Sequence, residues 1–142
     1  MERNINMANE IIKGMGFHHI ALKCKDLDKS VQMYMALGMK EVRRWVEKSG
    51  SRAVMLDVGD GGRIEMFSGG NDEYSTKGKW LHFAMKVDDV DAAFAVARAA
   101  GFAEHIAPKD VVMETSIPAG MAMRIAFVVG NDGELLELFK EA

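Results

Sequence analysis

The chain is poor in cysteine, with Cys24 as the single example among 142 residues. An intrachain disulfide is therefore excluded, and so is a zinc site built from several thiolates. Cys24 follows alternating apolar residues, which favours a small buried side chain over a nucleophile. Any chemistry of this protein must come from other residue types.

The sequence also lacks a basic excess and long apolar runs. Its net charge of −3 gives no cationic footprint for nucleic acid. The longest apolar stretches, such as residues 125–129, are far too short to cross a bilayer. The first residues, MERNINMANE, do not have the charged-then-apolar order of a signal peptide. We therefore expect a cytoplasmic protein that binds neither nucleic acid nor membrane.

The order of apolar and polar residues predicts an α+β chain that repeats itself. Strands are indicated by alternation, and helices by an Asp at the start and a Gly at the end. The first half reads βαβββ, with strands at 17–25, 41–47, 53–58 and 63–67 and a helix at 26–37. The second half reads as a strand at 80–87, a helix at 90–100, a loop with short strands at 104–113, and strands at 123–129 and 135–139.

The two halves match position by position. GFHHIALKCKDLDKS corresponds to KWLHFAMKVDDVDAA, and DGGRIEMF corresponds to DGELLELF. Self-similarity at a fixed spacing indicates a duplicated unit. We predict a tail at 1–15 and one domain at 16–142, made of modules at about 17–67 and 80–139 joined by a polar linker at 68–79.

Four residues at matched positions predict a metal site: His19, Glu65, His82 and Glu137. Alternation puts all four on the face of their strands opposite the face that packs under a helix. A carboxylate that points inward needs a cation. A single His in a strand usually has a structural role, but a His and a Glu that recur together on a common face favour a metal site. Two imidazoles and two carboxylates suit one divalent Ni, Zn, Co, Mn or Fe ion with open positions for substrate. By contrast, His18 falls on the helix-side face and His105 in a loop, so both are expected to be structural.

At these residues the sequence resembles the vicinal oxygen chelate superfamily, which includes the glyoxalase, bleomycin-resistance and dioxygenase proteins. The resemblance is carried by HHIALKCKDLDKSVQMY, RIEMF, LHFAMKVDDVDAAF and NDGELLELF, over about residues 16–140. It implies two βαβββ modules whose curved mixed sheets enclose a metal-binding cavity, within one chain or across a dimer. The resemblance favours a homodimer.

The His-Glu-His-Glu order is most similar to bacterial glyoxalase I, where the matching positions bind the metal. The resemblance implies a metal-dependent lyase or isomerase that moves a proton next to a carbonyl of a small substrate with adjacent oxygens. It gives Glu137 as the base, with Glu65 as its symmetry mate. The alternatives are a non-catalytic binding or resistance protein of the same fold, an epimerase, or a dioxygenase.

Five further residues are expected to contact the substrate, because they share the faces of the four ligands. Phe67, Trp80 and Phe139 would line the apolar part of the cavity, and Lys23 and Arg63 are candidate contacts for an anion. Two positions depart from glyoxalase I, in which glutathione is bound by an Arg and an Asn. Here those positions hold Lys23 and Gly69, with Asn71 nearby, so the thiol stays open.

Overall fold

The computed structural model describes residues 8, 10–11, 17–71, 82–113 and 121–142. Its first module contains β1 (His19–Lys23), α1 (Leu27–Met35), β2 (Lys40–Val46), β3 (Arg52–Asp57) and β4 (Arg63–Phe67). Its second module contains β5 (Phe83–Lys86), α2 (Val90–Ala99), β6 (Ala103–Met113), β7 (Met121–Val129) and β8 (Leu135–Glu141). The predicted βαβββ repeat is therefore confirmed.

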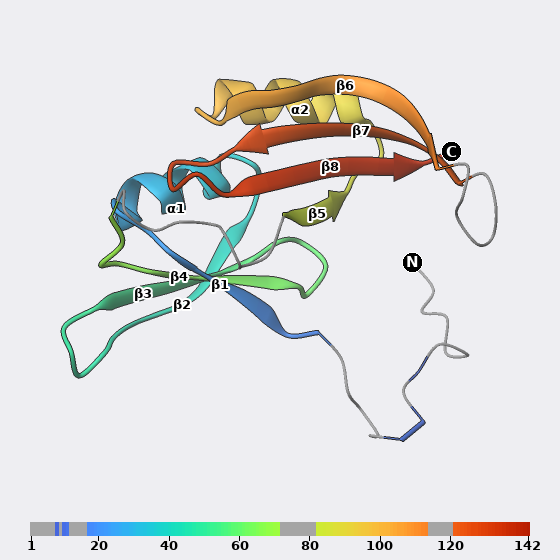
Figure 1. The fold of residues 1–142 in the computed structure, drawn as a ribbon. Coiled ribbons are helices and arrows are strands. Elements are labelled where there is room, and N and C mark those ends of the chain that lie inside the picture. The colour runs from blue at the N-terminus through green and yellow to red at the C-terminus, as the bar shows by residue number, and fades with distance from the viewer. Residues whose placement is uncertain (1–7, 9, 12–16, 72–81, 114–120) are drawn as a thin grey trace.

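Each module forms one four-stranded mixed sheet (Figure 1). The order is β1-β4-β3-β2 in the first sheet, here called sheet A, and β5-β8-β7-β6 in the second, sheet B. In both sheets the first strand runs parallel to the last strand of its module, and the other neighbours are antiparallel. This pairing places β1, which contains His19, beside β4 with Glu65, and it places β5, which directly follows His82, beside β8 with Glu137.

The two helices begin and end alike. The carboxylates of Asp26 and Asp89 accept hydrogen bonds from backbone N–H groups of the first helical turn, at 3.1 and 3.0 Å. Gly38 and Gly101 follow the helices with φ near +100°, a conformation that favours glycine. Met33 is buried in α1, whereas Met35 at the end of the helix is 44% exposed.

The outer antiparallel pair of each sheet contains an irregularity. The β2–β3 register shifts between Glu41 and Arg43, and the β6–β7 register shifts between Glu104 and Ile106 and again before Lys109. Extra residues of this kind break the alternation on which strand prediction depends. For that reason the predicted loop and short strands at 104–113 are in fact one continuous strand, β6. His105 therefore lies in a strand and not in a loop.

The helix-side faces of the two sheets share one hydrophobic core. Buried residues from both modules belong to it, and Tyr34 of α1 packs edge-on against Phe102 with ring centroids 5.0 Å apart. Neither module could bury this face alone, since a sheet of this size with one short helix leaves apolar surface exposed. The shared core fixes the modules to each other.

A buried polar junction reinforces this contact. The turn between β7 and β8 lies against the start of α1, where Asp132 accepts hydrogen bonds from the Lys25 backbone at 2.6 Å and from the Ser30 hydroxyl at 3.0 Å. Tyr34 Oη donates to Glu134 Oε1 at 3.2 Å, and the Asp132 N–H donates to Glu134 Oε2 at 3.1 Å. The turn of the second module is thus bonded to the first module.

Glu134 is only 2% exposed, and burial raises the pKa of its carboxyl to about 7. The nearby Asp132 carboxylate raises this pKa further, while hydrogen bonds from the backbone and from Tyr34 oppose the shift. Gly130 makes room for the carboxyl, because a Cβ at position 130 would lie 1.6 Å from Glu134 Oε1. The junction therefore depends on a residue without a side chain.

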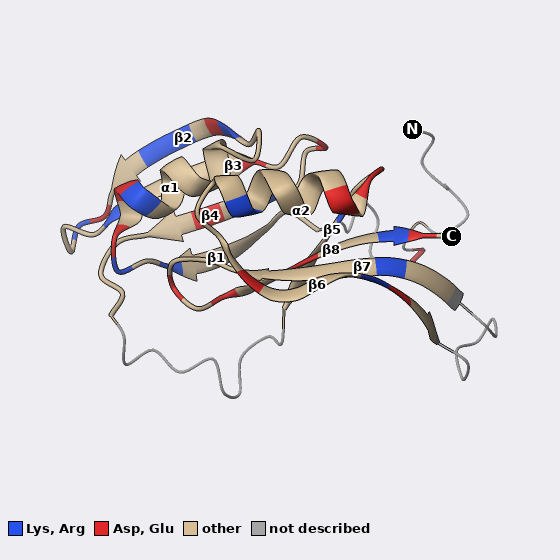
Figure 2. Cartoon of the chain, turned by 90° about the horizontal axis from the view of Figure 1, so that it is seen from above, with Lys and Arg blue, Asp and Glu red and all other residues tan. Residues whose placement is uncertain are grey.

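Charged residues of both signs are interspersed along the described strands and helices (Figure 2). No helix in the described part of the chain is long and apolar enough to cross a membrane.

Candidate metal centre

The first His–Glu pair lies on the face of sheet A opposite α1. Glu65 is the Cα partner of Ala21, two residues beyond His19 on the parallel neighbour strand. His19 Nε2 lies 3.8 Å from Glu65 Oε2. The imidazole is 38% exposed and the carboxylate 16%, so both side chains are reachable from outside the shared core.

The second pair repeats this arrangement on sheet B. Glu137 is the Cα partner of Ala84, two residues beyond His82. His82 Nε2 lies 3.2 Å from Glu137 Oε1, and the two side chains are 36% and 16% exposed. The near-equal exposure and geometry follow from the duplicated βαβββ unit.

Each pair fits one side of a metal coordination sphere. Divalent ions bind imidazole nitrogen and carboxylate oxygen at about 2.0–2.2 Å, which puts adjacent ligand atoms roughly 3 Å apart. The observed separations of 3.2 and 3.8 Å need little adjustment to meet that requirement. Neutral nitrogen and anionic oxygen donors also suit the borderline divalent ions.

The two pairs do not meet within the chain. In the part of the chain that the structure describes, no three His, Cys, Asp or Glu residues lie close enough to hold one metal ion. The shared core joins the helix-side faces of the sheets, and both His–Glu pairs lie on the opposite faces. Each module therefore carries one of the two predicted His–Glu pairs on its own outer face, here called its ligand face.

Three of the five predicted substrate contacts lie on the ligand face of sheet A: Lys23, Arg63 and Phe67. Lys23 is the Cα partner of Phe67, and Arg63 is the Cα partner of His19. Phe139 occupies the matching position on sheet B, as the Cα partner of Lys86. Trp80 lies outside the described residues. One aromatic residue was not predicted: Trp45, whose ring packs edge-on against Phe67 at 6.0 Å.

The two histidines have different neighbours. His18 Nδ1 lies 2.8 Å from His19 Nδ1, so one ring donates a hydrogen bond to the other. His82 instead meets the ring of Phe127 edge-on at 5.1 Å, and His105 packs against the same ring at 6.3 Å. His105 thus belongs to the surroundings of the second pair, which its predicted place in a loop did not indicate.

The two positions that depart from the glyoxalase I pattern lie together. Gly69 has a φ of +92°, and a Cβ built there would be 3.5 Å from Cε of Lys23. Lys23 and Gly69 are therefore neighbours on sheet A, at the two positions where the resemblance to glyoxalase I leads us to expect an Arg and an Asn.

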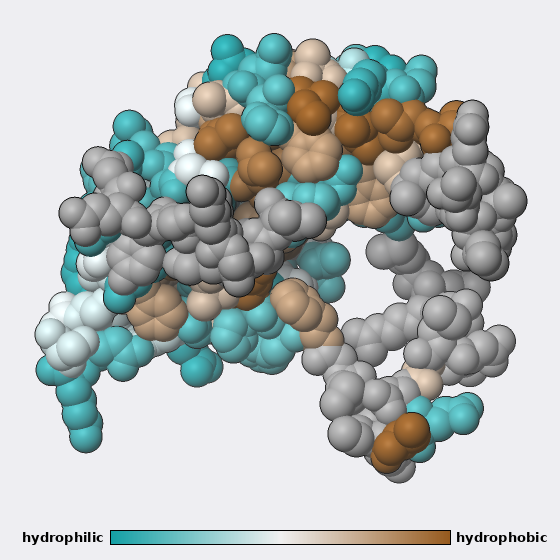
Figure 3. Space-filling model, in the orientation of Figure 1, coloured by the Kyte–Doolittle hydropathy of each residue, from teal (hydrophilic) through white to brown (hydrophobic). Residues whose placement is uncertain are grey.

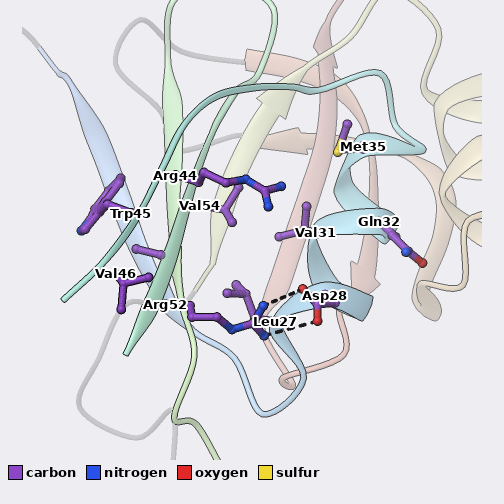
Figure 4. Close-up of a pocket in the computed structure, with 11 residues that line it drawn as sticks. Leu27, Asp28, Val31, Gln32, Met35, Arg44, Trp45, Val46, Arg52 and Val54 are labelled. Atoms are coloured by element: carbon purple, nitrogen blue, oxygen red, sulfur yellow. Dashed lines mark hydrogen bonds and ion pairs between the residues drawn. The ribbon is translucent and has the colours of Figure 1, made fainter. Parts of the chain in front are cut away.

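A groove of about 600 Å³ lies elsewhere, between α1 and the helix-side surface of β2 and β3 (Figure 4). Its cations are already paired: Arg52 binds both carboxylate oxygens of Asp28, and Arg44 binds Glu41. None of the four predicted ligands lines it. We therefore assign the candidate site to the ligand faces.

Known proteins resemble this chain in sequence over most of its length. The Glyoxalase/Bleomycin resistance protein/Dioxygenase superfamily pattern matches residues 16–139. A probable lactoylglutathione lyase of Vibrio parahaemolyticus is 30% identical over 128 residues, covering 86% of this chain and 88% of that protein.

Two solved structures show the same fold. A mutant of glyoxalase I from Zea mays has a TM-score of 0.72 at 24% identity, covering 89% of this chain and 44% of that one. A mutant of the fosfomycin resistance protein FosX from Listeria monocytogenes, complexed with Mn(II) and 1S,2S-dihydroxypropylphosphonic acid, has a TM-score of 0.65 at 19% identity. It covers 89% of this chain and 93% of that one. With its duplicated βαβββ modules and its sequence match over nearly the whole length, this chain belongs to the glyoxalase/bleomycin resistance/dioxygenase superfamily.

Proposed function

We propose that the protein is a metal-dependent lyase or isomerase of the glyoxalase I kind, acting on a small substrate with adjacent oxygens. The observation that carries the proposal is the pair of equivalent His–Glu sites, with nitrogen and oxygen 3.8 and 3.2 Å apart on two separate faces. The relative named as a probable lactoylglutathione lyase supports the same reaction class.

The active unit in this proposal is a homodimer. Since no three potential ligands gather within the described chain, His19 and Glu65 of one protomer would meet His82 and Glu137 of its partner. A twofold dimer brings the two faces together twice and so forms two equivalent sites. The shared core on the other side of each sheet keeps the faces rigid enough for such an interface.

One divalent ion, Ni, Zn, Co, Mn or Fe, fits each completed site. When bound, it would act as a Lewis acid on the adjacent oxygens of the substrate. The complex of FosX with Mn(II) supports a divalent ion in this fold.

The protein residues would divide the remaining tasks. Glu137 would take a proton from the carbon next to the carbonyl and return it to the neighbouring carbon, and Glu65 is its counterpart in the other half. Positioned carboxylates of this kind contribute roughly 10²- to 10⁴-fold to rate. Phe67 and Phe139 lie on the same faces as the ligands and would keep water from the reacting carbon.

Metal analysis of the purified protein tests the proposal. We expect about one divalent ion per site in the wild type and its loss in His82→Ala, because one of the four ligands is removed. Metal-loaded protein should then convert methylglyoxal in the presence of a thiol, with Glu137→Gln far slower than the wild type.

Three results would contradict this function. Unchanged metal content in both His82→Ala and Glu137→Gln would exclude the metal site. Metal binding without turnover for any thiol would favour an epimerase or a non-catalytic binder of the same fold, and oxygen uptake with Fe(II) would favour a dioxygenase.

A further inference from the structure

Arg63 has an unusual position beside the proposed metal ligands. It is the Cα partner of His19 on β1 and of Asp57 on β3, and it points to the same face of β4 as Glu65. Residues two apart on a strand are separated by about 7 Å. The guanidinium therefore lies within one small molecule's length of the metal ligands.

The Arg63 guanidinium is half-buried without an anionic partner among the described residues. Within the described part of the chain, its Nη1 donates a hydrogen bond to Met55 Sδ at 3.8 Å, and a thioether is a weak acceptor. The carboxylate of Asp57 is engaged by the backbone N–H groups of Gly59 and Gly61, at 2.7 and 3.3 Å. Glu65 faces His19. A permanently charged, partly desolvated group in this state favours an incoming anion.

At the position that matches Arg63, the second module has an apolar residue. The repeat matches Arg63 with Leu135, Asp57 with Val129 and Met55 with Phe127. With Ile125 and Phe139, these residues make the ligand face of sheet B largely apolar around Glu137. Figure 3 shows apolar residues gathered over β6, β7 and β8 on the side of the molecule that faces the viewer.

We propose that the substrate carries a compact oxyanion, a carboxylate or a phosphoryl group, close to its two adjacent oxygens, and that Arg63 binds it. A guanidinium fork matches two oxygens of either group. The apolar ligand face of the partner's second module would accept the uncharged remainder of the substrate. This inference rests on the proposed metal site and names the class of substrate that the site selects.

The short distance along β4 sets the size of this substrate. A group bound about 7 Å from the residue that ligates the metal must be attached within a few bonds of the reacting carbons. A substrate whose charge sits at the end of a long arm would place it beyond Arg63. The absence of the Arg and Asn expected for glutathione, with Lys23 and Gly69 in their places, agrees with a compact substrate.

Calorimetry on Co(II)-loaded protein tests the inference with matched compounds. Lactate and malate share a 2-hydroxy acid group, and malate adds a carboxylate. Glycerate and 3-phosphoglycerate share the same group, and the second adds a phosphoryl group. We expect at least one of the two added anions to tighten binding roughly ten- to a hundredfold, as charged hydrogen bonds do.

The variants locate this gain. Arg63→Leu, which copies the residue of the second module, should remove the advantage of the added anion and leave the affinities for Co(II) and lactate unchanged. Arg63→Lys should keep part of it, because the charge remains without the fork. Lys29→Leu, which removes an exposed charge from α1, should behave as wild type, and thermal unfolding checks that all variants fold.

The outcomes separate this inference from the proposed function. Wild-type protein that binds Co(II) but gains nothing from either added anion overturns the inference and leaves the metal site standing. The same holds if Arg63→Leu retains the gain. Wild-type protein that binds no Co(II) overturns both.

Discussion

The last turn of each module is built from matching residues and ends in opposite surroundings. In the first module, Asp60-Gly61-Gly62 is open to solvent apart from Gly62, and the Asp60 carboxylate accepts a hydrogen bond from the Gly62 N–H. In the second, Asp132-Gly133-Glu134 packs against the first module, and Glu134 is buried. In the first module this turn only reverses the chain, whereas in the second module it also joins the two modules.

The ligand faces differ in a similar way. Both keep a His and a Glu at matching positions, yet sheet A surrounds them with Arg63 and Asp57, and sheet B with Leu135 and Val129. In our proposal, the His and the Glu that both modules share bind the metal. The residues that differ between the modules give each ligand face its own properties. Substitutions at equivalent positions of the two modules should therefore have unequal effects.

The largest expected effect is on metal binding, when the ligand face of sheet A in one subunit meets the ligand face of sheet B in its partner. His19→Ala and His82→Ala should each remove tight metal binding when present in every subunit. A heterodimer with one subunit of each kind contains one fully intact site out of two. We expect this heterodimer, purified through two different tags, to hold about half as much chelator-resistant metal as the wild type.

This experiment separates an intersubunit site from one within a chain. If each subunit held its own complete site, the heterodimer would contain only damaged sites and would bind no metal tightly. Light scattering on the wild type supplies the control, since a monomer that retains metal would contradict the dimeric arrangement.

A smaller effect is expected at the junction. Burial raises the pKa of Glu134 from 4.5 to about 7, so the folded protein binds more protons than the unfolded chain between these values. This contribution to stability is fully present below pH 4.5 and is lost as the pH rises through 7. Glu134→Gln should therefore be more stable than wild type at pH 8, by on the order of 2 to 3 kcal/mol, with little difference at pH 5.

Urea unfolding at several pH values measures this difference. Glu104→Gln removes an exposed carboxylate of β6 and serves as the matched control for the loss of one negative charge. A constant gap between Glu134→Gln and wild type from pH 5 to pH 8 would contradict the assigned titration.

The smallest expected effect tests the unequal neighbours of the two histidines. If His19 donates from Nδ1 to His18, its Nε2 lone pair is left for the metal, as hydrogen bonds to ligating histidines commonly ensure. His18→Ala should then weaken metal affinity roughly tenfold. His105→Ala, on the other half, should leave the affinity unchanged in competition with a chelator, and an equal loss in both variants would refute the assignment to His18.

Much of this structure could be predicted from local sequence patterns. The caps at Asp26 and Asp89, the terminal glycines and the faces of β1 and β4 depend on residues near one another in the chain. The face of each ligand follows from alternation with period two. The sequence therefore predicted two His–Glu pairs on the faces opposite the helices.

The features that were missed depend on contacts between distant segments. Alternation assigns a residue to a face but does not determine which face another module covers, so the separation of the two pairs could not be predicted. The irregular register of β6 hid the strand around His105. Glu134 is hydrogen-bonded to Tyr34, which lies 100 residues away in the chain. From the sequence alone, a Glu after Asp-Gly looks like any exposed turn residue.

Gly130 gives the junction a further consequence. The carboxyl oxygen of Glu134 occupies the space where the first side-chain carbon of any other residue would stand. Even an alanine at this position would push the Glu134 carboxyl out of its site and away from Tyr34. The hydrogen bond between these two residues, which helps to hold one module to the other, would then be lost. The alignment of the two halves, and thus the geometry that each offers to a partner, depends on the absence of a single carbon atom.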